Sequence, residues 1–198
     1  MVSKDEIKLA LKYIDKNWEM QNNDFDAKTK YIYRCKTVDE VKANSAGNND
    51  IQNYALHRWY NFNCAKLHED MFIAFGAMKE DDEYHKTIDF YLFDTSFDLK
   101  TTYFPKKIAD KENYDLKKRI GKNKLIFWLY ENQSKQGRFH LENRLFIICE
   151  DLKSKSNFSL IEEKIKNFID FSKQNGFNKI SLNDKIICSD IILISNTL

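Results

Sequence analysis

The stretch IDFYLFDTSFDLKTTYF, residues 88–104, predicts a β-hairpin because it is rich in aromatic and β-branched residues, which favour strands. Apart from Asp94, which suits a turn, three charged side chains interrupt this apolar run: those of Asp89, Asp98 and Lys100. Side chains two positions apart on a strand share a face, so Asp98 and Lys100 point the same way. Charges in a segment that otherwise belongs in a core indicate a function, whereas an exposed hairpin face with an ordinary ion pair is the alternative.

The register of this hairpin decides whether the two acids meet. A turn centred between Phe93 and Asp94 places Asp89 opposite Asp98, with Cβ atoms roughly 4.5–5.5 Å apart. Local turn preference competes, because Asp94 and Thr95 form turns more readily than Phe93 and favour a hairpin centred on Thr95. We expect the first register, which brings both carboxylates together on one face.

Hydrophobic periodicity predicts the elements around the hairpin. Helices are expected at residues 4–20 behind an N-cap at Ser3, from Asp50 to Phe75 ahead of Gly76, in a basic segment near 110–119, and at 159–172. Strands are expected at 31–35, 124–130, 144–150 and 185–194, in addition to the hairpin. This order predicts an α/β fold in which helices flank both faces of a mixed β-sheet.

The composition is typical of a soluble globular chain. The 198 residues are 31% charged and 42% hydrophobic, which is enough for one compact domain with a core at about 50–194 and an N-terminal helical extension at 1–49. No apolar run reaches the roughly 18 residues that span a bilayer, and the charged N-terminus differs from a signal peptide, so we expect a cytoplasmic protein without a membrane partner. Four scattered cysteines predict reduced thiols rather than disulfides: Cys35, Cys64, Cys149 and Cys188.

Positive charge is concentrated after the hairpin. Residues 105–124 hold eight Lys or Arg against three acids, and residues 132–144 add Lys135, Arg138 and Arg144 against Glu142. Such a basic zone suits a phosphate backbone, although most lysine clusters are solvated surfaces. We predict DNA contacts at Lys117, Lys118, Arg119, Gln133, Arg138 and His140.

The spacing of an acid and a lysine carries little weight by itself, because seven matches to Asp or Glu followed two positions later by Lys occur in the chain. Only Asp98 with Lys100 lies in a β-rich run behind a strand that carries a further acid. In this context the segment TIDFYLFDTSFDLKTT and the α-β-β-β-α-β order around it, over about 50–194, resemble the PD-(D/E)XK nucleases, the restriction-endonuclease-like superfamily. Ile88 replaces the proline that is usual before the first acid.

The resemblance maps the first acid of the family onto Asp89, its second acid onto Asp98 and its lysine onto Lys100. Leu99 matches the apolar position between the second acid and the lysine, and we include it with Asp89 and Asp98 in the predicted metal site. The family often places an extra metal-binding acid on the preceding helix, which maps onto Glu69. The family implies Mg²⁺-dependent hydrolysis of phosphodiester bonds in DNA.

The residue types suit this chemistry. Mg²⁺ prefers carboxylate and water oxygens, and a lysine beside them can position the attacking water and stabilise charge on the scissile phosphate. We therefore predict a type II restriction endonuclease that cuts double-stranded DNA as a homodimer, because two strands require two active sites. A nuclease-like DNA-binding or regulatory protein without metal chemistry is the alternative. The recognition sequence and the preference for DNA over RNA stay open, as does a role in repair or in a phage.

Other motifs point away from competing chemistries. Cys64 and His68 are one helical turn apart and could form half of a metal site, but no second pair accompanies them, so a core or interface role is favoured. The sequence has no Walker loop, GxGxxG, GxSxG or HExxH motif, which argues against nucleotide-binding, serine-hydrolase and zinc-protease functions.

Overall fold

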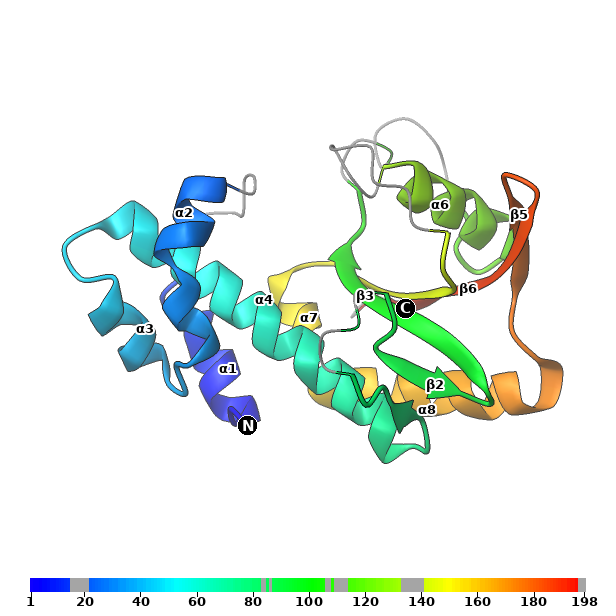
Figure 1. The fold of residues 1–198 in the computed structure, drawn as a ribbon, viewed down its shortest axis with the longest axis horizontal. Coiled ribbons are helices and arrows are strands. Elements are labelled where there is room, and N and C mark those ends of the chain that lie inside the picture. Colours follow the sequence, from blue (N-terminus) through cyan, green and yellow to red (C-terminus); the bar gives the residue numbers. More distant parts are fainter. Residues whose placement is uncertain are drawn as a thin grey trace. The chain divides into compact units, whose positions relative to one another are not determined.

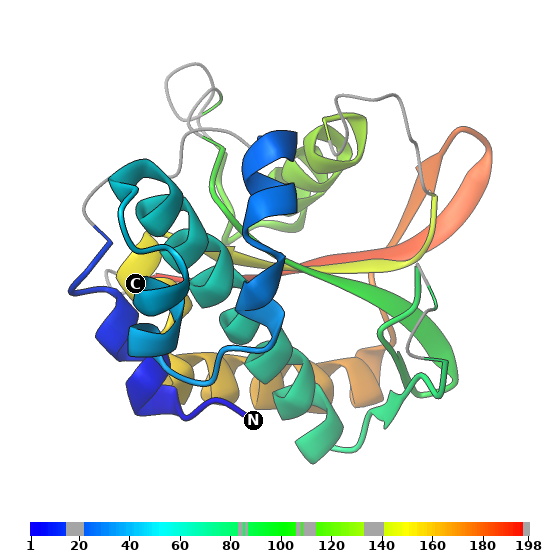
Figure 2. The same ribbon diagram turned by 60° about the vertical axis from the view of Figure 1, so that its left-hand side comes forward.

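The computed structural model describes residues 1–14, 22–82, 85, 87–105, 108, 114–132 and 141–195. The chain divides into two compact units, an N-terminal unit (Met1–Leu67) and a C-terminal unit (His68–Leu198), and the boundary lies within the long helix α4 (Asn49–Ala74). The described part of the N-terminal unit is helical, whereas the C-terminal unit is mixed α/β (Figures 1 and 2). Among the described residues, no helix is both long and apolar enough to cross a membrane.

The described part of the N-terminal unit contains these helices: α1 (Lys4–Ala10), α2 (Asn23–Lys28), a 3₁₀ helix (Lys30–Tyr33), α3 (Val38–Asn44) and the first part of α4. Ser3 caps α1 as predicted, and its Oγ accepts a hydrogen bond from the Glu6 N–H at 3.1 Å. The predicted helix at 4–20 is too long in its described part, because the backbone tightens after Ala10 into turns with bonds between residues three apart. Residues 15–20 of that prediction lie outside the described residues.

The predicted strand at 31–35 is wrong, because the segment begins with the 3₁₀ helix Lys30–Tyr33. Its buried residues are Ile32 and Cys35, three positions apart, which is the spacing of a helical turn and not of a strand. The Trp59 indole N–H donates to the Cys35 carbonyl at 3.0 Å, so this carbonyl is hydrogen-bonded by a side chain of α4 and not by the backbone of a neighbouring strand.

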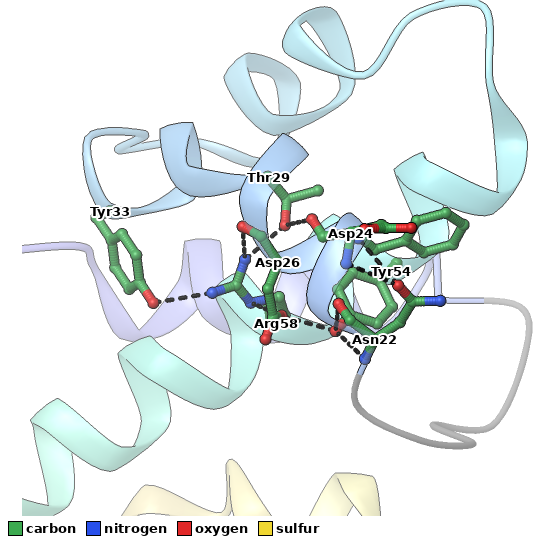
Figure 3. A network of polar contacts seen from close by, with 8 residues as sticks. Asn22, Asp24, Asp26, Thr29, Tyr33, Tyr54 and Arg58 are labelled. Carbon is green, nitrogen blue, oxygen red and sulfur yellow. Dashed lines mark hydrogen bonds and ion pairs between the residues drawn. The ribbon is translucent and has the colours of Figure 1, made fainter.

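Arg58 of α4 binds α2 and the 3₁₀ helix together (Figure 3). Its guanidinium pairs with the Asp26 carboxylate, with Nε and Oδ1 3.1 Å apart, and donates to the hydroxyls of Thr29 and Tyr33 at 2.5 and 2.9 Å. Tyr54, about one turn earlier on α4, donates its hydroxyl proton to the same Asp26 carboxylate at 2.7 Å. These contacts hold α2 and the 3₁₀ helix against α4 within the N-terminal unit.

A six-stranded mixed sheet with the strand order β1-β2-β3-β4-β6-β5 is the centre of the C-terminal unit. Its strands are β1 (Met78–Lys79), β2 (Phe90–Leu92), β3 (Thr95–Tyr103), β4 (Arg144–Cys149), β5 (Lys179–Leu182) and β6 (Lys185–Ile194). Strands β1, β2 and β3 are antiparallel, β3, β4 and β6 are parallel, and β5 pairs antiparallel with β6. The predicted α/β class with a mixed sheet is confirmed.

Helices cover both faces of this sheet (Figures 1 and 2). The helices of the C-terminal unit are the end of α4, α6 (Arg119–Glu131), α7 (Leu152–Lys155) and α8 (Phe158–Asn175). Phe146 and Ile148 of β4 pack into the core under α6. On the other face, Phe72 of α4 stacks on Phe90 of β2 with ring centroids 4.7 Å apart and meets Phe168 of α8 edge to face.

Long periodic segments were predicted correctly. Helix α4 covers the predicted span from Asp50 almost to its end and is followed by Gly76 at φ 100°, a left-handed conformation that glycine adopts readily. Helix α8 contains the predicted helix at 159–172, and β4 and β6 coincide with the strands predicted at 144–150 and 185–194.

The predicted strand at 124–130 is wrong, because this segment is the second half of α6. Its sequence KLIFWLY is continuously apolar, a pattern that buried strands and buried helices share. Leu125, Ile126, Leu129 and Tyr130 are the buried residues, and this is the spacing of one helical face. Since β3 and β4 are parallel, the chain needs a crossover between them, and α6 supplies it.

The basic helix predicted near 110–119 is wrong in its described part, because α6 begins only at Arg119 and a turn precedes it. Residues 109–113 lie outside the described residues. Gly121 allows this turn to pack against the first turn of α6, since a Cβ there would lie 2.1 Å from the Asp115 carbonyl oxygen. Local packing therefore shortens the helix to the part that covers the sheet.

The β2–β3 hairpin adopts the predicted register. Its pairs are Phe90 with Phe97, Tyr91 with Ser96, and Leu92 with Thr95. The turn is therefore centred between Phe93 and Asp94, whose φ angles of 48° and 60° are both left-handed, as a two-residue primed turn requires. The competing hairpin centred on Thr95 is not formed.

Burial explains why this register outweighs the local turn preference. Phe90, Leu92 and Phe97 are almost fully buried, whereas a hairpin centred on Thr95 would set Phe90 opposite Lys100. Burying each of these three side chains stabilises the fold by about 1.5–3 kcal/mol. A residue held at positive φ costs about 1–3 kcal/mol, and only two are needed. The apolar pattern thus imposes an unfavourable turn.

Candidate functional site

The hairpin register brings Asp89 and Asp98 together. Asp89 directly precedes β2, at the point where the β2–β3 pairing ends with Phe90 and Phe97, and its N–H donates to the Phe97 carbonyl at 2.8 Å. Its Oδ2 accepts a hydrogen bond from the Leu99 N–H at 2.6 Å. The two carboxyl groups are therefore close enough to interact, and the pairing of Asp89 directly opposite Asp98 stays a prediction.

Strand β3 changes its partner at Asp98. Thr95 to Phe97 pair with β2, whereas the residues from Asp98 onward pair with β4 in parallel. The Asp98 N–H donates to the Asn143 carbonyl at 3.0 Å, just before β4 begins. The acid thus lies where three strands meet, and this place leaves it 3% exposed.

Lys100 lies on the same face, two positions further along β3. Its Nζ forms an ion pair with Asp98 Oδ1, and its side chain is 49% exposed while that of Asp98 is 4% exposed. The lysine can therefore meet a ligand from the solvent side, whereas the Asp98 carboxylate lies beneath it.

Arg144 is the residue of this site that the sequence analysis missed. It opens β4 as the direct partner of Asp98, and its Nε and Nη2 both contact Asp98 Oδ2 at 2.8 Å. The sequence counts Arg144 in the basic zone after the hairpin, but in the structure this arginine is not on the surface: it is 4% exposed and its guanidinium carbon lies 5.2 Å from the centre of the Tyr130 ring. The available signal was an arginine at the start of a wholly apolar strand, which needs a buried acidic partner.

Four charges balance in this site, two from Asp89 and Asp98 and two from Lys100 and Arg144. Burial raises the pKa of the Asp89 carboxyl above its ordinary value, and the negative charge of Asp98 adds to this effect. The Leu99 N–H and the Lys100 charge act in the opposite direction. The two acids are therefore close enough to disfavour each other's negative charge.

The other residues of the predicted metal site are placed as follows. Leu99 donates its backbone N–H to Asp89, and its role toward a metal stays a prediction. Glu69 is half-buried on α4. Across the part of the chain that the structure describes, no group of three His, Cys, Asp or Glu side chains that could hold a metal ion is found, and the role of Glu69 toward a metal stays a prediction.

Three of the residues predicted to contact DNA are described by the structure, and they lie at the end of α6 away from Tyr130. Lys117, Lys118 and Arg119 are exposed at the start of α6, and Lys118 pairs with Asp115 at 3.0 Å. Tyr130, which contacts Arg144, lies at the other end of α6, about 17 Å further along the helix axis. The other predicted contacts, Gln133, Arg138 and His140, lie outside the described residues.

His68 has a core role, as the sequence analysis favoured. Its Nε2 lies 3.1 Å from the Lys155 carbonyl and its Nδ1 lies 3.0 Å from the Thr101 hydroxyl. A carbonyl only accepts, so Nε2 carries the proton and Nδ1 accepts from Thr101. Burial lowers the pKa of His68 to about 3, which keeps the ring neutral and unsuited to acid–base work near pH 7.

Asp89 and Asp98 fit a hard divalent cation, because Mg²⁺ is commonly held by one or two carboxylates, with waters and a substrate phosphate completing its shell. The half-exposed Lys100 adds a cation on the side from which a phosphate would approach. In comparisons with protein-family models, curated proteins and solved structures, nothing matches this chain. The functional argument therefore depends on the geometry of these residues.

Proposed function

We propose that this protein is a Mg²⁺-dependent endonuclease that hydrolyses phosphodiester bonds in double-stranded DNA, most simply a type II restriction endonuclease. The observation that carries the proposal is the closeness of the Asp89 and Asp98 carboxylates at the end of the β2–β3 hairpin, where the Asp89 carboxylate accepts from the Leu99 N–H and Lys100 pairs with Asp98. The order of elements also supports it, since α4, the antiparallel strands β1 to β3, the crossover helix α6 and the parallel strand β4 follow the α-β-β-β-α-β order of the restriction-endonuclease-like core.

In this proposal Asp89 and Asp98 hold the metal ion, and Lys100 positions the attacking water and stabilises charge on the scissile phosphate. A bound Mg²⁺ supplies Lewis acidity and lowers the pKa of a coordinated water. The raised pKa of Asp89 reflects burial and the neighbouring negative charge, and a bound cation offsets both effects.

Phosphate contacts outside the reaction centre come from Lys117, Lys118 and Arg119. Their distance of about 17 Å from Tyr130 along α6 corresponds to roughly five base-pair steps of duplex DNA, so one bound duplex can reach both places. Cutting both strands requires two reaction centres, and we therefore propose that a homodimer acts.

A second candidate is a catalytically inactive nuclease-like protein that binds DNA or regulates another factor. One observation favours it: both oxygens of Asp98 already contact cations of the protein, Oδ1 with Lys100 and Oδ2 with Arg144. Such a protein would keep the fold and the exposed basic residues without metal chemistry.

The deciding experiment incubates the purified protein with plasmid and genomic DNA in Mg²⁺ or in EDTA and sequences any new ends. The endonuclease proposal expects Mg²⁺-dependent ends at a defined sequence, and loss of these ends in Asp98→Asn. A double variant with Glu162→Gln and Lys164→Ala is the matched control, because it removes an acid and a lysine of the same spacing from helix α8. DNA binding without cleavage would favour the second candidate, and cleavage that persists in Asp98→Asn would remove Asp98 from the reaction centre.

A further inference from the structure

The ion pair between Asp98 and Arg144 is buried at the proposed reaction centre. The parallel register of β3 and β4 makes the two residues direct partners, and the side chains are only 4% and 5% exposed. Arg144 approaches Asp98 Oδ2 with two nitrogens, each at 2.8 Å. Both nitrogens approach the same carboxylate oxygen, and such a charge-assisted contact is stronger than a hydrogen bond between neutral groups.

The charge balance of the site shows what this pair does when no metal is bound. Asp89 and Asp98 contribute two negative charges, and Lys100 and Arg144 contribute two positive ones. An uncompensated buried carboxylate is very costly, so Arg144 supplies the compensation that a divalent cation would otherwise provide. A metal ion that enters this balanced site meets a positive charge already on one of its ligands.

Arg144 can release Asp98 without losing every favourable contact. Its guanidinium carbon lies 5.2 Å from the centre of the Tyr130 ring, within the range of a cation–π interaction. The Tyr130 hydroxyl donates to the Glu142 carbonyl at 2.8 Å, which holds the ring in place beside the guanidinium. The arginine therefore has a second favourable neighbour next to its position on Asp98.

We propose that Arg144 is a positioning residue that stands in for the metal ion and competes with it for Asp98. In the metal-free protein it keeps the Asp98 carboxylate aligned toward Asp89 and Lys100. Divalent cations bind only as the guanidinium withdraws from Oδ2, so Arg144 lowers the metal affinity of the site. This inference rests on the proposed function, because it requires Asp98 to be a metal ligand.

The test measures Mn²⁺ binding by calorimetry, and thermal unfolding with and without Mn²⁺, in the wild-type protein and in Arg144→Met. Methionine fills similar apolar space without a charge. We expect the variant to unfold at a lower temperature without metal, to bind Mn²⁺ at least tenfold more tightly, and to gain more in unfolding temperature from Mn²⁺ than the wild type does. Arg144→Lys keeps the charge and should bind Mn²⁺ with an affinity close to that of the wild type.

Arg58→Met is the matched control, because Arg58 also pairs with an aspartate, Asp26, but in the N-terminal unit (Figure 3). This variant should also lose thermal stability, and Mn²⁺ should not restore it. The contrast separates the loss of a structural arginine from the loss of a competitor for metal.

Three results would overturn the inference. The first is an Arg144→Met variant that binds Mn²⁺ no more tightly than the wild type, in a protein whose Mn²⁺ binding is abolished by Asp98→Asn. This result would overturn the inference about Arg144 and leave the proposed function standing. An Arg144→Met protein that fails to fold even with Mn²⁺ present would also overturn it alone, since the metal is then no substitute for the guanidinium. Absence of Mn²⁺ binding in the wild type and in Arg144→Met alike would overturn both this inference and the metal-dependent function.

Discussion

Replacing Asp98 by Asn would remove one charge from a buried ion pair while keeping the shape of the side chain. Asp98 and Arg144 are almost fully buried and joined by two contacts of 2.8 Å. Asparagine offers the guanidinium only a neutral acceptor, so the positive charge of Arg144 is left uncompensated by its main partner. Breaking a buried pair in this way costs about 3–5 kcal/mol of unfolding free energy.

Hydrogen exchange of the β4 amides is the appropriate assay, because it reports the opening of the C-terminal unit by itself. A loss of about 3–5 kcal/mol corresponds to a fall in protection of about two to four orders of magnitude. Asp94→Asn is the control on the same hairpin, since Asp94 is exposed in the turn at φ 60°, a conformation that asparagine tolerates. We expect its effect to stay within about 0.5 kcal/mol. A loss in Asp98→Asn no larger than in this control would refute the reasoning.

Three further predictions concern the charges of the site and its surroundings. Folding raises the pKa of the Asp89 carboxyl above its ordinary value of 3.8, so the folded state binds this proton more tightly than the unfolded state does. The wild-type protein therefore loses unfolding free energy as the pH rises from 3.8 through the pKa of the folded state. Relative to the wild type, Asp89→Asn should therefore gain unfolding free energy over this pH range and keep the gain at higher pH. Urea denaturation at several pH values measures this difference, and the opposite trend would contradict the prediction. Lys100→Ala should abolish Mg²⁺-dependent cleavage, because the proposed role of this lysine is at the reaction centre. Its circular dichroism and DNA affinity should stay almost unchanged, since the side chain is half-exposed. Cleavage at the wild-type rate would contradict this role. Replacing Lys117, Lys118 and Arg119 by Gln should weaken binding to all DNA sequences and make the slope of log K against log salt shallower by up to about 2.7, measured by fluorescence anisotropy. An unchanged slope would mean that these side chains do not contact phosphates.

The sequence by itself determined the elements that have a clear period. Helix α8 and strands β4 and β6 follow from their apolar positions, and α4 follows from its length and the glycine after it. Between the two hairpin registers that the sequence offered, only the one centred between Phe93 and Asp94 places Phe90, Leu92 and Phe97 on the same face, and the structure buries all three. Charges in that apolar stretch identified Asp89, Asp98 and Lys100 as candidate site residues, and in the structure the two carboxyl groups are close enough to interact.

Tertiary structure decided the remaining features, which depend on partners distant in the sequence. The apolar run at 124–130 suits a strand or a helix equally, and it becomes part of α6 because the parallel strands β3 and β4 require a crossover. Arg144 resembles a surface residue in the sequence, yet the β3–β4 register sets it against Asp98, 46 positions earlier. Periodicity records which side of an element is buried, but it does not record which other element covers that side, and the partner of a buried charge depends on that second choice.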